Sequence, residues 1–272
     1  MKREINLLTL TYLLVLLFLF ASGMFNGALS IIIYILGFAL PLFLALYLSR
    51  EYREGDGKEY LTLDARAAVM TAPLLFIVVG VAFLFSYVSA LIMGALFGVK
   101  SAVDLSAGFG ISLITHALLP AFLEEALFRY LPMKLLLRRS ARVTVILSAS
   151  FFALLHHSFL QIPYAFAAGF IFIAIDIIAD SVLPSVILHF LNNVISIVWS
   201  FYIEGTEFAV PFIISVGVLF VLSVLSVLLL YGRLYRDGVK RLTSRGEPYG
   251  VGYYPLLFVL PTLFIAVTEL FV

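Results

Sequence analysis

Long apolar runs recur along almost the whole chain, and each is long enough to cross a bilayer as a helix. About 20 apolar residues span the hydrocarbon core in helical form. Such runs lie near residues 5–24, 27–49, 66–98, 105–137, 142–159, 162–180, 183–203, 208–231 and 253–271. The sequence therefore predicts an all-α, polytopic bundle of about eight or nine transmembrane helices. Pro120 lies inside the fourth run, where we expect it to kink the helix.

The composition indicates that the lipid bilayer is the partner of this chain. It excludes a soluble domain, a nucleic-acid-binding surface and cysteine chemistry. Hydrophobic residues make up 63% of the 272 residues and charged residues 12%, whereas soluble domains are about half apolar and a quarter charged. The net charge is +1, and no basic block offers a nucleic-acid surface. The absence of cysteine excludes disulfides, thiol catalysis and cysteine-ligated metal.

We expect one membrane domain in three parts and a cytoplasmic N-terminus. The parts are N-terminal helices at 1–104, a core at 105–203 that contains most of the ionisable side chains of the apolar runs, and C-terminal helices at 204–272. If nine helices alternate, one side of the membrane holds fifteen Lys and Arg residues and the other holds only Lys100, while Arg129 lies inside a helix. The fifteen are Lys2, Arg3, Arg50, Arg53, Lys58, Arg66, Lys134, Arg138, Arg139, Arg142, Arg233, Arg236, Lys240, Arg241 and Arg245. Cytoplasmic loops are enriched in these residues.

Ionisable and amide side chains within the apolar runs are few. Each ionisable group costs about 2.5–3.5 kcal/mol at a helix centre, so those that persist usually mark function. They are His116, Glu124, Glu125, Arg129, His156, His157, Asp176, Asp180, His189 and Glu269, accompanied by Asn192 and Asn193. We interpret Asp176, Asp180, Glu269 and His116 as structural, although His116 lies on roughly the same helix face as Glu124.

The first local pattern is Glu124-Glu125-x-x-x-Arg129. Glu125 and Arg129 are four residues apart and can pair on one helix face. Glu124 lies about 100° away around the helix, so it need not share that partner and can act as a general base. The alternative is a buried ion pair beside a helix-end glutamate.

The other two patterns are Phe152-x-x-x-His156, followed by His157, and His189-x-x-x-Asn193. A spacing of four puts each pair on one helix face. The alternative for both is a packing or interhelical hydrogen-bonding role, which is common in membrane bundles.

Spacing about an arginine-rich turn brings these patterns to one depth. Glu124 and His156 each lie 16 residues from Ser140, so in an antiparallel hairpin both side chains sit roughly 24 Å from the turn. His189 follows Pro184 by five residues. We expect Glu124, His156 and His189 to converge in a pocket toward the cytoplasmic face.

Such a set suits peptide hydrolysis by an activated water molecule. A carboxylate and an imidazole form a general-base pair, and a second imidazole with an amide can stabilise an oxyanion. We favour a site without a cofactor, and a zinc ion held by Glu124, His156 and His189 is the alternative. The sequence motifs of zinc, serine and aspartyl membrane proteases do not occur.

In this order, the three patterns resemble the motifs of the type II CAAX prenyl endopeptidases. This is the wider CAAX protease and bacteriocin-processing family, which includes the Ras-converting enzyme, and the likeness covers about residues 105–200. It implies that Glu124 and His156 activate the water, that His189 and Asn193 form the oxyanion site, and that Glu125 and Arg129 support the pocket. It also implies a peptide or lipidated protein substrate, cut near a prenylated Cys-a-a-X terminus at the cytoplasmic face.

Two other functions stay open. A non-catalytic immunity or scaffold protein would keep the same fold. A proton-coupled transporter would also contain membrane Glu and His, but it should place polar groups along a path through both leaflets and often has an inverted repeat.

Overall fold

The computed structural model describes residues 2–50, 60–62, 65–97, 108–156, 158–230 and 232. Within these residues all regular structure is helical. The single helices are α1 (Lys2–Gly23), α2 (Ala28–Ser49), α3 (Ala65–Phe97), α7 (Ala141–Leu155), α8 (Ile162–Ala179) and α10 (Ala209–Leu229). Helix α9 (Leu183–Val198) continues as the π-helix η3 (Trp199–Ile203).

One span is built from five consecutive helical segments. They are α4 (Phe109–Ser112), the π-helix η1 (Leu113–Leu118), α5 (Leu119–Glu125), the π-helix η2 (Ala126–Tyr130) and α6 (Leu131–Leu136). Pro120 is the second residue of α5, two residues after the end of η1. Where the sequence led us to expect a kink at Pro120, the structure shows a change of helical register just before it.

The predicted transmembrane bundle is confirmed. Seven helices of the described chain are long and apolar enough to cross a membrane, and α7 is a shorter apolar helix. Their limits lie within a few residues of the predicted runs. The predicted helix at 253–271, together with Glu269 and His157, lies outside the described residues.

One predicted limit that shifts by four residues is the end of α7, which stops at Leu155 and not at residue 159. The backbone N–H of His156 turns back to Ala153 O at 3.2 Å. The Nδ1 atom of the same histidine donates a hydrogen bond to the carbonyl oxygen of Phe152, 3.0 Å away. His156 therefore ends the helix through its own imidazole.

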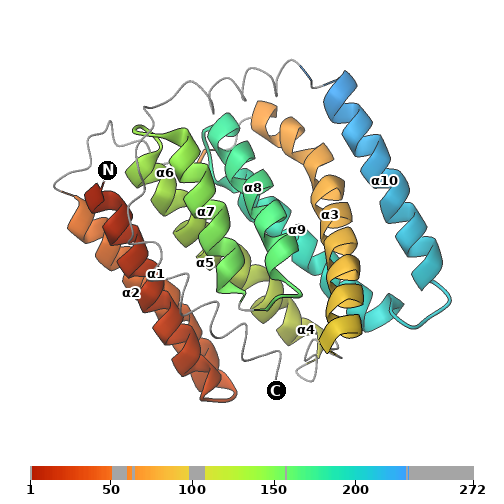
Figure 1. Ribbon diagram of the computed structural model, residues 1–272, viewed down its shortest axis with the longest axis horizontal. Coiled ribbons are helices and arrows are strands. Elements are labelled where there is room, and N and C mark those ends of the chain that lie inside the picture. The colour runs from red at the N-terminus through yellow and green to blue at the C-terminus, as the bar shows by residue number, and fades with distance from the viewer. Residues whose placement is uncertain are drawn as a thin grey trace.

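The helices run up and down in antiparallel order (Figure 1). The α4–α6 span, α7, α8 and α9 occupy the middle, with the α1–α2 pair on one flank and α3 with α10 on the other. Tyr12 of α1 packs the α1–α2 pair against the central helices. Its ring centroid lies 5.0 Å from that of Phe128 and 4.4 Å from that of Phe151.

The two ends of the bundle differ in the turns they carry (Figure 1). The N-terminus, the turn from α6 to α7 and the turn from α8 to α9 lie at the upper end in this view, which we call the arginine end after Arg138 and Arg139. The turn from α1 to α2, the start of α4, the turn from α7 to α8 and η3 lie at the opposite end.

Candidate active site

A buried ion pair lies at the centre of the bundle. Glu125 Oε2 is 3.1 Å from Arg129 Nε, and both side chains are fully buried. This confirms the predicted i,i+4 pair, although the turn that carries it is π-helical. The guanidinium also lies over two aromatic rings, 4.2 Å from the Phe152 centroid and 5.4 Å from the Phe172 centroid. These faces stabilise the buried cation.

The second oxygen of Glu125 holds His189. Glu125 Oε1 is 2.8 Å from His189 Nδ1. Because an ionised carboxylate only accepts hydrogen bonds, Nδ1 carries a hydrogen and donates it to Glu125, and Nε2 is the ring nitrogen left for a further contact. The ring stacks on Phe172 with centroids 5.6 Å apart. The sequence showed that Glu125 could pair with Arg129, but not that it also orients this histidine.

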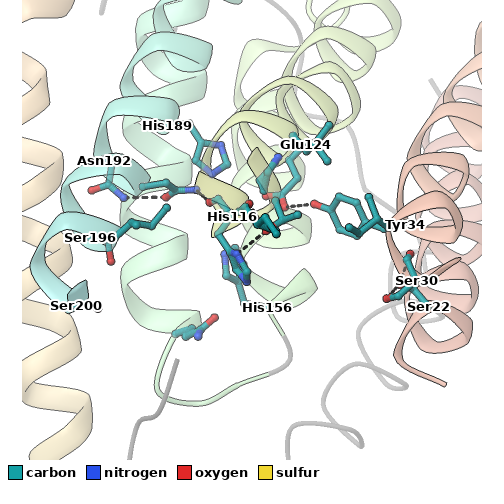
Figure 2. Close-up of a pocket in the computed structure, with 18 of the residues that line it drawn as sticks. Ser22, Ser30, Tyr34, His116, Glu124, His156, His189, Asn192, Ser196 and Ser200 are labelled. Carbon is teal, nitrogen blue, oxygen red and sulfur yellow. Dashed lines mark hydrogen bonds between the residues drawn. The ribbon is translucent and has the colours of Figure 1, made fainter. Parts of the chain in front are cut away.

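Glu124 has a different partner, as its position around the helix predicted. Its Oε1 accepts a hydrogen bond from the hydroxyl of Tyr34 on α2 at 3.1 Å (Figure 2). The side chain of Glu124 is almost fully buried. Sequence reasoning missed Tyr34, because nothing in a tyrosine of an apolar run signals a contact 90 residues away.

His156, like His189, donates a hydrogen bond from Nδ1. A backbone carbonyl only accepts, so the contact to Phe152 O places the hydrogen on Nδ1 and the lone pair on Nε2. The ring lies 5.1 Å from Phe152 and 6.0 Å from Tyr164, between centroids. Tyr164 is a further residue of the site that the sequence did not indicate.

Asn193 contacts the backbone of another helix. Its Nδ2 donates to the carbonyl of His116 at 2.9 Å, and its Oδ1 accepts from Asn192 at 3.3 Å. The ring of His116 is held by Thr115: that hydroxyl gives its hydrogen to Ile111 O at 2.9 Å and so accepts from His116 Nδ1 at 2.8 Å.

One cavity of about 870 Å³ brings the predicted residues together. Glu124, His156, His189 and Asn193 all line it, and so do Tyr34 and Tyr164. Glu125 and Arg129 do not line the cavity, but Glu125 contacts the lining residue His189. His116, which we interpreted as structural, also lines it. Figure 2 shows Glu124 and His189 on one side of His116, with His156 on the other. The volume is within the range of about 300–1,000 Å³ that is usual for ligand sites.

The zinc alternative can be compared with this geometry. Among the described residues, no group of three His, Cys, Asp or Glu side chains is arranged to hold a metal ion. Glu124, His156 and His189 line one cavity without forming such a group.

The match to a known family falls on this part of the molecule. Residues 106–195 match the model of the Rce1-like type II CAAX prenyl endopeptidases. This Rce1-like segment covers about a third of the 272 residues and contains all three motifs. The family implies a membrane protease. Comparison with curated proteins and with solved structures gives no match.

Within the Rce1-like segment, Asp176 supports the helix that carries His189. Asp176 is fully buried, and its Oδ1 accepts from the backbone N–H of Ser185 at 3.0 Å. That N–H belongs to the first turn of α9, where it has no carbonyl partner within the helix. A carboxylate is also favoured here because the N-terminus is the positive end of the helix dipole. Asp176 is thus structural, as expected. Tyr34 lies outside the matched residues.

Proposed function

We propose that this protein is an intramembrane endopeptidase in which Glu124 and His156 activate a water molecule. The observation that carries this proposal is the cavity itself. It places a carboxylate and two imidazoles, each with its hydrogen fixed on Nδ1, around a space large enough for a peptide segment. Inside a bilayer, such a concentration of ionisable groups is costly and is a mark of function.

The residues divide the reaction between them. Glu124 and the Nε2 lone pair of His156 take a proton from water as it attacks the peptide carbonyl, and the proton then passes to the leaving amine. Tyr34 holds the Glu124 carboxylate in place. The catalytic steps need no covalent intermediate and no metal ion.

His189 and Asn193 stabilise the oxyanion by donating hydrogen bonds to it. An amide nitrogen has two hydrogens, so Asn193 can hold the His116 carbonyl with one and the oxyanion with the other. His189 can donate through Nε2 once its ring is protonated, and the Glu125 carboxylate at Nδ1 stabilises that cation. Donors that are already in place when the oxyanion forms are worth about 2.7–4 kcal/mol each.

The Rce1-like match makes a C-terminal CAAX-type peptide the substrate class to examine first. Purified protein in nanodiscs should cleave a quenched fluorescent CAAX peptide, supplied in farnesylated and unmodified forms. Glu124→Gln and His156→Ala should each abolish cleavage, because both remove a water-activating group. Glu207→Gln, an exposed glutamate outside the cavity, is the matched control and should keep full activity.

Three outcomes would contradict the proposal. Cleavage that survives Glu124→Gln would remove this carboxylate from the chemistry, and cleavage lost on chelation and restored by zinc would favour the metal alternative. A folded protein that binds these peptides without cleaving them would instead support a non-catalytic immunity or scaffold role.

A further inference from the structure

The cavity reaches one end of the bundle and not the other. Its lining includes Asn26 and Gly27 in the turn from α1 to α2, Gln161 at the start of α8 and Ser200 in η3. All these positions lie at the end opposite to the arginine end (Figure 1). At the arginine end, no described residue of the turns from α6 to α7 or from α8 to α9 lines it.

The part of the cavity nearest this end has no charged side chain, and its lining mixes apolar residues such as Phe25, Ile31 and Ile111 with polar ones. The polar residues include Ser22, Asn26, Ser30, Gln161, Ser196 and Ser200. Figure 2 shows Ser22, Ser30 and Ser200 lying below Glu124 and His189 in this view. Irregular backbone and polar side chains at membrane depth are tolerated where they line a water-filled cavity. These polar side chains offer hydrogen bonds to water between the site and that end.

The charges at the two ends are opposite in sign. Seven basic residues of the described chain lie at the arginine end: Lys2, Arg3, Arg50, Lys134, Arg138, Arg139 and Arg142. At the opposite end, the described turns contain no Lys or Arg, and the turn before α10 contains Glu204 and Glu207. Positive charge near the ends of membrane spans marks the cytoplasmic side. The arginine end is thus the cytoplasmic end.

The cavity reaches one end of the bundle, and the basic residues lie at the other end. Together these two observations point to an active site that opens on the extracytoplasmic side. We infer that its substrate is a peptide segment presented there, so a CAAX-type terminus would be cut only if it reaches the site from that side. This reverses the cytoplasmic opening expected from the sequence. The statement about the substrate rests on the proposed protease function, whereas the statement about the opening does not.

Thiol labelling tests the opening without any need for catalysis. The chain has no cysteine, so each single variant carries one reactive thiol. Ser196→Cys places it in the cavity, Glu207→Cys at the same end outside the cavity, and Arg142→Cys at the arginine end. A membrane-impermeant maleimide is applied to intact cells and to inside-out vesicles.

In intact cells, Ser196→Cys and Glu207→Cys should be labelled and Arg142→Cys should not, and the pattern should invert in vesicles. Labelling of Arg142→Cys in intact cells would overturn the orientation. Labelling of Ser196→Cys only in vesicles, while Glu207→Cys reacts in intact cells, would overturn the direction of the cavity.

A second measurement addresses the substrate. An impermeant fluorogenic peptide should be cleaved when it is supplied to intact cells, with this cleavage lost in Glu124→Gln. Cleavage by inside-out vesicles but not by intact cells would overturn the inferred side. Absence of cleavage in both, with the expected labelling, would contradict the protease function and leave the opening established.

Discussion

The side-chain amide of Asn193 donates to the backbone carbonyl of His116, 2.9 Å away on another helix. His116 belongs to the π-helix η1, next to the start of α5, and Pro120 four residues further on has no N–H to donate to this carbonyl. Asn193 supplies a donor that Pro120 cannot, and it links α9 to the span that carries Glu124.

This compensation can be measured with a double-mutant cycle. Asn193→Ala should lower the free energy of unfolding by about 1 kcal/mol. In a Pro120→Ala background the new N–H can serve the same carbonyl, so the cost of Asn193→Ala should shrink. Thermal unfolding in one detergent gives all four values. An equal cost in both backgrounds would mean that the carbonyl does not depend on this amide.

Glu125 and Arg129 should stabilise the fold only when both charges are present. Arg129→Met leaves a buried carboxylate uncompensated, which typically costs about 3–5 kcal/mol, so we expect a large loss of folded protein. Glu125→Gln combined with Arg129→Met removes both charges and should recover much of that loss. Arg142→Met, at an exposed position on α7, is the control. A double variant no more stable than Arg129→Met would argue against the pairing.

Tyr34 should act on catalysis through Glu124. Tyr34→Phe removes one hydrogen bond to a carboxylate, worth about 1.5–3 kcal/mol, so kcat should fall roughly tenfold to a hundredfold with little change in KM. Tyr87→Phe, on an exposed tyrosine of α3, should change neither. If Tyr34→Phe raised only KM, the hydroxyl would contact substrate and would not orient the carboxylate.

The close packing of α1 on α2 depends on Gly37. A Cβ at this position would lie 2.5 Å from Phe18 Cβ, and that atom cannot move without its backbone. Gly37→Ala should therefore push the two helices apart and cost about 1–3 kcal/mol, seen as a lower Tm. Gly217→Ala, where nothing lies within 4 Å, should leave Tm unchanged or raise it, because alanine favours helix. Equal effects would show that helix propensity decides both.

Hydropathy predicted the helices well because membrane spans are long and uniform. The i,i+4 spacing also predicted the contact of Glu125 with Arg129, since both partners lie on one helix. The contacts of Tyr34 with Glu124 and of His189 with Glu125 join different helices, and their partners depend on how those helices pack. A periodic pattern contains no information about that packing.

Two local features were also beyond the sequence patterns. The π-helices η1 and η2 shift the helical register on both sides of Glu124, and an angle counted at 100° per residue does not anticipate them. The expected depth of the site followed from counting residues back to Ser140. That count fixes the distance to the turn, but not the side on which the cavity opens.

The shortness of α7 has a consequence for the surrounding lipid. Its 15 residues span roughly 22 Å, less than the bilayer's hydrophobic thickness of about 30 Å. The following turn, with Ser158 and Gln161, must then be submerged unless the leaflet thins beside it. Acyl-chain length would thereby influence how readily water and peptide reach His156, so the host membrane's composition becomes a determinant of turnover.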